Sequence, residues 1–175
     1  MNSKKYIVKL NNYKDYLKFV NIDLNIEKNC KWIYDIIDKK SNINKILYEN
    51  KNFVLIMQKR MKPNEIKTFH LLAFPKDKTI KSIRDLTNIH IPLLQEMVKK
   101  SKEYIKKNYN FEKNEIETHF HYPPSVLLLH IHFVLANNKN FRKPLIEHSV
   151  NSVIENLNID TDYYKKVKIE IMKKL

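Results

Sequence analysis

The stretch HFHYPPSVLLLHIHFV, residues 119–134, decides the fold and carries four of the seven histidines of the chain. Both halves are rich in β-branched and aromatic residues, and Pro123 and Pro124 lie between them. This pattern predicts two strands, Ile116–Tyr122 and Val126–Ala136, that are joined at the prolines. The stretch therefore indicates a strand pair that bears histidines.

Side chains alternate across a strand, so His130 and His132 are expected on the same face, roughly 7 Å apart along the strand. His119 and His121 share a face of the preceding strand for the same reason. A hairpin-like pairing of the two strands would bring up to four imidazoles together. Such a cluster makes this strand pair the first place to look for chemistry.

The rest of the chain predicts strands and helices in an order that favours an α+β domain over alternating βαβ units. The expected sheet is largely antiparallel, with one long helix and flanking helices. Strands are predicted at Tyr6–Leu10, Ile46–Tyr48, Phe53–Met57, Phe69–Phe74 and Val167–Met172, and helices at Tyr13–Val20, Cys30–Lys40, from the N-cap Thr87 to Tyr109 with an irregularity at Pro92, and Pro144–Leu157.

Composition narrows the class of protein. The chain has no glycine, which removes the phosphate loop and the dinucleotide fingerprint and leaves turns of positive φ to asparagine. Its 175 residues, of which 43% are hydrophobic, predict a single domain over residues 1–175. Cys30 is the single cysteine and no apolar run suits a signal peptide or membrane span, so a reducing compartment and no membrane partner are expected. The net charge of +14 would attract polyanions such as nucleotides or RNA.

Three accounts of the histidine cluster remain open from the residues alone. The imidazoles could be hydrogen-bonded structural groups on a half-buried sheet. They could bind zinc, since imidazole is a common ligand of that ion. The third account is nucleophilic transfer, because a neutral imidazole has a lone pair that attacks phosphorus while its other nitrogen is held by a hydrogen bond.

Several segments, in order, resemble the histidine triad hydrolases, and among them the scavenger decapping enzymes. The central one is His121-Tyr122-x-Pro124-Ser125 followed by His130-Ile131-His132-Phe133. The others are residues 32–40 (WIYDIIDKK), 53–56 (FVLI), 83–87 (IRDLT), 92–94 (PLL) and 153–157 (VIENL). The resemblance spans about residues 26–172 and implies the histidine-triad fold.

The resemblance implies a role for each matched residue. His130 is expected to be the nucleophile that attacks the phosphate next to methylated guanosine, leaving a nucleotidyl-histidine that water resolves. The expected phosphate contacts are His132, His121, Ser125 and Arg60, the last of which matches a family lysine. The expected contacts of the cap base are Trp32, which stacks on the cationic base, and Asn42 and Gln58 at its edge. No cofactor and no metal are implied.

The chain departs from the family at three places. Leu128 replaces the first histidine of the triad, which removes an imidazole beside the nucleophile. Asn42 and Gln58 stand where the family has acidic residues, and an amide lacks the charge that favours a cationic base. Residues 1–25 form a short extension in place of the family's N-terminal domain.

The leading functional hypothesis is therefore a metal-independent hydrolase of the 5'-5' triphosphate in capped mononucleotides or short capped RNA. One alternative is a histidine triad hydrolase of other dinucleoside polyphosphates or nucleoside phosphoramidates. Another is a cap- or nucleotide-binding protein with impaired catalysis. The resemblance also implies a homodimer in the cytoplasm, with the nucleus as a second location.

Overall fold

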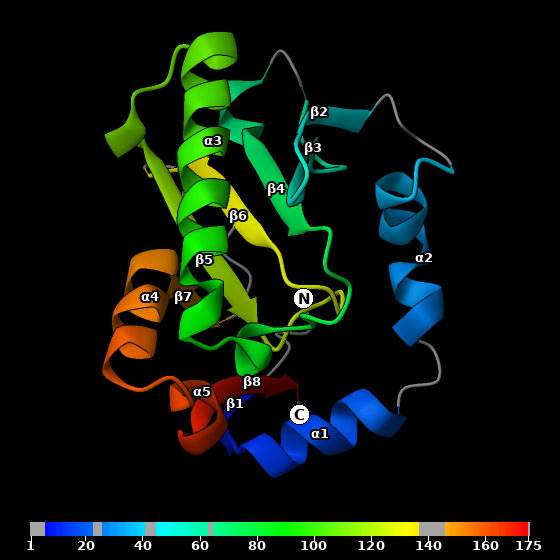
Figure 1. Cartoon of the computed structure of the whole chain (residues 1–175), viewed down its shortest axis with the longest axis vertical. Helices are drawn as coiled ribbons and strands as arrows, with labels where there is room; N and C mark the ends of the chain where they lie inside the picture. The colour runs from blue at the N-terminus through cyan, green and yellow to red at the C-terminus, as the bar shows by residue number, and fades with distance from the viewer. Residues whose placement is uncertain (1–5, 23–25, 41–44, 63–64, 137–145, 175) are drawn as a thin grey trace.

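The computed structural model describes residues 6–22, 26–40, 45–62, 65–136 and 146–174. These ranges form a mixed α and β structure, which confirms the predicted class (Figure 1). The strands are β1 (Tyr6–Asn11), β2 (Ile46–Glu49), β3 (Phe53–Met57), β4 (His70–Pro75), β5 (Ile116–Tyr122), β6 (Ile131–Leu135), β7 (Ile146–Ser149) and β8 (Ile169–Lys174). The α-helices are α1 (Tyr13–Ile22), α2 (Ile26–Ile37), α3 (Ile91–Tyr109), α4 (Val150–Ile159) and α5 (Tyr163–Lys166).

The main sheet has six strands in the order β2-β3-β4-β6-β5-β7, and each neighbouring pair is antiparallel. The strand β6 thus lies between β4 and β5, near the middle of the sheet. A separate antiparallel pair, β1 with β8, joins the two ends of the described chain. The predicted antiparallel sheet is confirmed.

The two faces of the main sheet are covered by different helices. Helix α3 lies across one face (Figure 1), where its Leu94 and Met97 pack in a buried cluster with Ile131 and Phe133 of β6. Helix α2 lies apart from α3, and its Ile33 belongs to a second apolar cluster on the other face of β3 and β4. That second cluster contains Cys30, Ile33, Ile36, Ile37, Val54, Ile56, Leu72, Phe74, Leu127 and Leu128. This apolar cluster covers only part of the second face, and the histidines of β5 and β6 lie on the same face.

The strand predicted from Val126 begins five residues later, at Ile131. The reason is a competing hydrogen bond, because the backbone N–H of Leu129 donates to the carbonyl of Ile80 at 2.8 Å and not to a neighbouring strand. The segment before β6 is therefore an irregular loop that crosses toward Ile80.

Two helix starts also differ from the prediction. Thr87 begins a short 3-10 turn, Asn88–His90, in which its backbone N–H donates to Nδ1 of His90 at 3.0 Å. Helix α3 begins only at Ile91, with Pro92 in its first turn, where a missing N–H costs no hydrogen bond. Thr87 is thus not the N-cap of α3, and Pro92 causes no irregularity beyond the first turn.

The helix predicted over Pro144–Leu157 is shorter at its start. Residues 144–145 lie outside the described residues, and Ile146–Ser149 form the edge strand β7. Helix α4 starts at Val150 because the side chain of Ser149 accepts a hydrogen bond from the N–H of Ser152, an N-cap that the sequence analysis missed.

Positive φ angles occur at Lys39 and Asn110, both at 57°. Asn110 ends α3 in the left-handed region, as expected for asparagine in a chain without glycine. Lys39 shows that the expectation of asparagine at every such turn was wrong.

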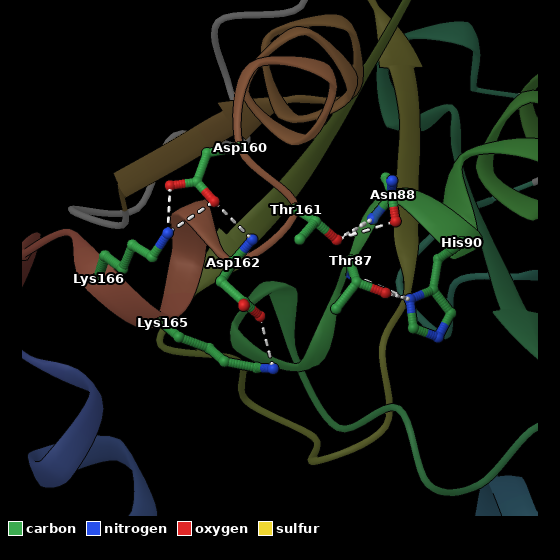
Figure 2. A network of polar contacts seen from close by, with 8 residues as sticks. All are labelled: Thr87, Asn88, His90, Asp160, Thr161, Asp162, Lys165 and Lys166. Carbon is green, nitrogen blue, oxygen red and sulfur yellow. Dashed lines mark hydrogen bonds and ion pairs between the residues drawn. The ribbon is translucent and has the colours of Figure 1, made fainter.

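Polar contacts attach the α4–α5 corner to the start of α3, as Figure 2 shows. The hydroxyl of Thr161 donates to Oδ1 of Asn88 at 2.8 Å. Nearby, Lys166 pairs with Asp160 at 2.6 Å and Lys165 pairs with Asp162 at 2.8 Å. Exposed ion pairs of this kind contribute little to stability individually.

Arg84 ties the sheet to the terminal segments. Its side chain is fully buried and donates to the carbonyls of Tyr164, Val167 and Asn11 and to the hydroxyl of Tyr122, at 2.5 to 3.1 Å. Hydrogen bonds from a charged donor are stronger than neutral ones. The guanidinium thus holds the short sheet and α5 against β5.

Replacing Arg84 by methionine should lower the free energy of unfolding by about 3 kcal/mol or more, because several buried oxygens lose their donor. Urea denaturation of the variant would measure the change. The matched control is Arg60→Met at an exposed arginine, for which the change should stay within about 0.5 kcal/mol. Equal effects of the two substitutions would contradict this role for Arg84.

Within the described residues, no helix combines the length and the apolar character that a membrane crossing requires.

Candidate active site

Three adjacent strands bring histidines to one face of the sheet. The central residue is His132 on β6, which lies opposite His119 of β5 in the strand register. On its other side β4 places Leu72 opposite His132 and starts with His70. Because alternate residues share a face, His70, His119, His121 and His132 project from the same side as Leu72 and Phe74.

The imidazoles gather around His132. Its ring centroid lies 3.9 Å from that of His121, 4.8 Å from His130, 5.0 Å from His70 and 5.2 Å from His119. The predicted four-histidine cluster is therefore present, although His130 precedes the strand. We call these five residues the imidazole cluster.

His70 was missed from the sequence. It opens a buried strand whose alternate residues Leu72 and Phe74 are apolar, so the pattern resembled ordinary core. Only the pairing of β4 with β6, which places His70 opposite Val134, brings it to His132. Hydrophobic alternation does not reveal which strands are neighbours, and no local signal marked this residue.

Hydrogen bonds link the cluster in pairs. Nε2 of His70 lies 2.8 Å from Nδ1 of His132, and Nε2 of His119 lies 3.3 Å from Nε2 of His121. Nε2 of His132 is buried and has no hydrogen-bond partner among the described residues. The edge strand β7 adds a carboxylate, because Oε1 of Glu147 lies 3.8 Å from Nε2 of His119 and 4.0 Å from Nε2 of His121.

The contacts of His130 define its protonation. Nδ1 lies 2.8 Å from the backbone carbonyl oxygen of Leu128, which only accepts hydrogen bonds, so Nδ1 carries the proton. In a neutral ring the lone pair is then on Nε2. The ring also stacks on Phe74, with centroids 4.9 Å apart and planes at 24°. The result is an oriented imidazole with a defined nucleophilic nitrogen.

Burial keeps the cluster uncharged. Burial, together with a smaller effect of the neighbouring imidazoles, lowers the pKa of His70 to about 4 and that of His121 to about 3. The pKa of His130 and that of His132 are also lowered, mainly by burial. A neutral His130 is the form that attacks an electrophile.

Leu128 has a structural role through both its side chain and its backbone. Its side chain is fully buried in the apolar cluster with α2, beside Cys30 and Ile33. Its carbonyl orients His130. At the position where the resemblance expects the first triad histidine, the backbone carbonyl of Leu128 thus sets the tautomer of His130, the candidate nucleophile.

Trp32 lies beside the cluster. It is on α2 with 39% of its surface exposed, and its ring meets Phe74 edge to face at a centroid distance of 5.9 Å. Phe74 in turn stacks on His130. Phe74 therefore lies between the accessible indole of Trp32 and the candidate nucleophile His130.

Gln58 and Arg60 follow β3, where the backbone N–H of Gln58 continues the ladder to the carbonyl of His70 at 3.0 Å. The side-chain oxygen of Gln58 accepts from the backbone N–H of Arg60 at 2.5 Å, and the side chain of Arg60 is exposed. Ser125 is exposed in the loop before β6. Asn42 lies outside the described residues.

Comparison with known proteins identifies the family of the chain. Residues 31–144 match the profile of the family described as "Scavenger mRNA decapping enzyme C-term binding". The chain belongs to this family. Every predicted site residue of this decapping-family chain falls inside the matched range, as do Leu128 and the imidazole cluster.

The relatives include proteins named m7GpppX diphosphatase. Those of Sus scrofa and Homo sapiens are each 33% identical over 144 residues, covering 78% of this chain and 42% of the relative. The one from Ascaris suum is 30% identical over 145 residues, covering 80% of this chain and 48% of the relative. The chain therefore spans less than half of the length of these relatives.

The buried imidazoles of this decapping-family chain predict an acid-sensitive fold. In the unfolded chain a histidine titrates near 6.5, whereas in the folded chain the pKa is about 4 for His70 and about 3 for His121. Below pH 6.5 the unfolded state therefore binds more protons, and the free energy of unfolding falls as pH drops toward 4 and then 3. Urea denaturation at pH 7.5, 6, 5 and 4.5 should show a loss on the order of 5 kcal/mol, because each of the two histidines contributes about 1.4 kcal/mol per pH unit between 6.5 and 4.5.

The variant His70→Phe keeps an aromatic ring at the same place and should reduce the slope of this pH dependence. A free energy of unfolding that stays constant from pH 7 to 5 would show that the imidazoles are not held neutral by burial.

Proposed function

We propose that this chain hydrolyses the 5'-5' triphosphate of capped mononucleotides or short capped RNA, through a nucleotidyl intermediate on His130. The observation that carries the proposal is the 2.8 Å contact between Nδ1 of His130 and the carbonyl of Leu128, which leaves Nε2 as a nucleophile. The relatives named m7GpppX diphosphatase supply the substrate class.

In the first step, the lone pair on Nε2 of His130 attacks the phosphorus next to the methylated guanosine. A P–N bond forms, the bond to the bridging oxygen breaks, and a nucleoside diphosphate or its oligonucleotide leaves. The imidazole becomes cationic while Nδ1 keeps its proton, and the carbonyl dipole of Leu128 stabilises that charge.

In the second step, water attacks the same phosphorus and the P–N bond breaks. The water proton passes to solvent or to the departing product, methylguanosine monophosphate is released, and His130 returns to its neutral form. No redox change accompanies either step. Splitting the reaction in this way replaces one difficult displacement by two easier ones.

The phosphate oxygens are expected to meet His132, His121, Ser125 and Arg60. His132 offers a buried Nε2 that has no other partner among the described residues, and His121 lies 3.9 Å from it between ring centroids. Arg60 adds an exposed positive charge. Donors that are fixed before the reaction stabilise developing charge at little cost in reorganisation.

Trp32 is expected to stack on the cationic base, since indole is the strongest aromatic partner for a cation. Its contact with Phe74, which stacks on His130, supports this role because the base and the scissile phosphate belong to one small substrate. Asn42 and Gln58 remain the expected contacts at the edge of the base.

A second candidate is hydrolysis of other dinucleoside polyphosphates or of nucleoside phosphoramidates. The specific observation is at Gln58, where the amide oxygen already accepts from the N–H of Arg60 and carries no full charge. Such a group favours a cationic base less than a carboxylate does. The third candidate, a nucleotide-binding protein with impaired catalysis, rests on the loss of the imidazole at Leu128. A homodimer and a cytoplasmic or nuclear location stay predictions from the resemblance.

The His130→Asn variant should lose turnover by at least a thousandfold with the fold intact, since asparagine fits the space but has no nucleophilic nitrogen. The assay follows release of methylguanosine monophosphate from a methylated cap dinucleotide, with unmethylated cap, diadenosine polyphosphate and adenosine phosphoramidate as parallel substrates.

His148→Asn is the matched control, because His148 pairs with Phe120 and faces away from the imidazole cluster. Equal rates on methylated and unmethylated caps would favour the second candidate. Turnover that survives in His130→Asn would refute the covalent route, and binding without turnover in the wild type would leave only the third candidate.

Trp32→Ala should raise KM for the methylated cap by roughly 5- to 30-fold, which corresponds to the loss of about 1–2 kcal/mol of cation–π attraction. The rate at saturating substrate should change much less, because Trp32 does not contact the reacting phosphorus. Trp32→Phe is the control that keeps an aromatic face, and its KM should lie between those of the wild type and Trp32→Ala. An unchanged KM in Trp32→Ala would remove the stacking role.

A further inference from the structure

The proposed hydrolysis assigns no role to two histidines of the imidazole cluster. It uses His130, His132 and His121, whereas His70 and His119 have no step assigned. Glu147 is a further carboxylate directed at the same place from β7. Histidines that converge on one point together with a carboxylate form the donor set of a transition-metal site.

The donor atoms lie close enough together to share one ion, and one pair has the separation of a tetrahedral site. Ring nitrogens of His119, His121 and His132 all lie within 4.8 Å of one another. Zinc bonds imidazole nitrogen at about 2.0–2.1 Å in tetrahedral sites, so two such ligands should be about 3.3 Å apart. The Nε2 atoms of His119 and His121 are separated by 3.3 Å.

Glu147 stands where a fourth ligand is needed. Its Oε1 is 3.8 Å from Nε2 of His119 and 4.0 Å from Nε2 of His121, about half an ångström beyond the ideal separation. The side chain of Glu147 is 36% exposed, so a change of rotamer can close this gap. The carboxylate also offsets part of the charge of a divalent ion.

His132 meets the two demands on a ligand histidine. Its Nε2 is buried with no partner among the described residues, and the residue as a whole is only 5% exposed. Its Nδ1 lies 2.8 Å from His70, so the ring is held in orientation by a neighbour outside the ligand set. Metal-binding histidines regularly have such a support on the second nitrogen.

An ion can reach the site from the surface. A hollow of about 470 Å³ lies beside β5 and β7, and its walls include His119, Glu147, Ser149 and Asn151. Two of the four candidate ligands thus border an accessible space. The nitrogen-rich donor set selects zinc and similar transition ions over magnesium or calcium, which prefer oxygen.

We propose that His119, His121, His132 and Glu147 form a binding site for a transition-metal ion of the zinc type, and that the bound ion shuts off hydrolysis by occupying two of the phosphate contacts. Metal binding itself is independent of the proposed function, and only its inhibitory effect rests on it. The site therefore makes the activity respond to free zinc.

The direct test is competition of the untagged protein with a chromophoric zinc chelator, combined with the visible absorption of bound Co²⁺ as a report of tetrahedral geometry. The wild type should take one equivalent of metal. His119→Asn and Glu147→Gln should each bind zinc at least tenfold more weakly, while the control His148→Asn should bind as the wild type does. Circular dichroism verifies that each variant is folded.

The inhibitory effect is measured separately on cap hydrolysis. His119→Asn should hydrolyse the substrate as the wild type does in chelator, and should need at least tenfold more zinc for the same inhibition. If no substrate is hydrolysed, the chelator competition still decides the metal site.

Absence of stoichiometric zinc in the wild type would overturn the site. Equal zinc affinity in His119→Asn and in the wild type would assign the metal to other surface groups and overturn it equally. An unchanged affinity in Glu147→Gln alone would remove the carboxylate from the ligand set. Stoichiometric binding without inhibition would refute the regulatory part.

Discussion

The pairing of β6 between β4 and β5 is the constraint on which the rest of the site depends. It sets His132 opposite His119 on one side and next to the strand of His70 on the other. A slip of one residue would turn His132 into the apolar layer under α3 and expose Phe133 in its place. The apolar layer and the polar layer therefore specify the same register, and burial of Ile131 and Phe133 keeps the imidazoles together.

The strand alternation made the outline predictable. The grouping of His119 with His121, the long central helix and the antiparallel sheet all followed from period and from turn residues, whereas His130 reaches His132 from the loop before β6. The late start of β6 did not follow from them, because the backbone N–H of Leu129 donates to the carbonyl of Ile80, a partner 49 positions away in the sequence. His70 and Glu147 were missed for a related reason: each reaches the site only through pairing of strands that are distant in the sequence.

The boundary between apolar and polar halves of this face passes through the loop before β6. Leu128 packs toward α2 while its carbonyl turns to His130, so one residue contributes to both halves. Phe74 has the same double position, with its ring between Trp32 and His130. The leucine at residue 128 accordingly extends the apolar half, at a position whose backbone carbonyl contacts His130.

The hydrogen bond between His70 and His132 has one further consequence. Either ring can donate, because both are neutral and each carries one proton. When His70 donates, Nε2 of His132 bears the proton and presents a donor to an anion. When His132 donates, the same Nε2 presents a lone pair to a cation. The exchange between these tautomers changes no net charge. Without a change in pH, this buried pair can therefore offer Nε2 of His132 either as a donor to an anion or as a lone pair to a cation.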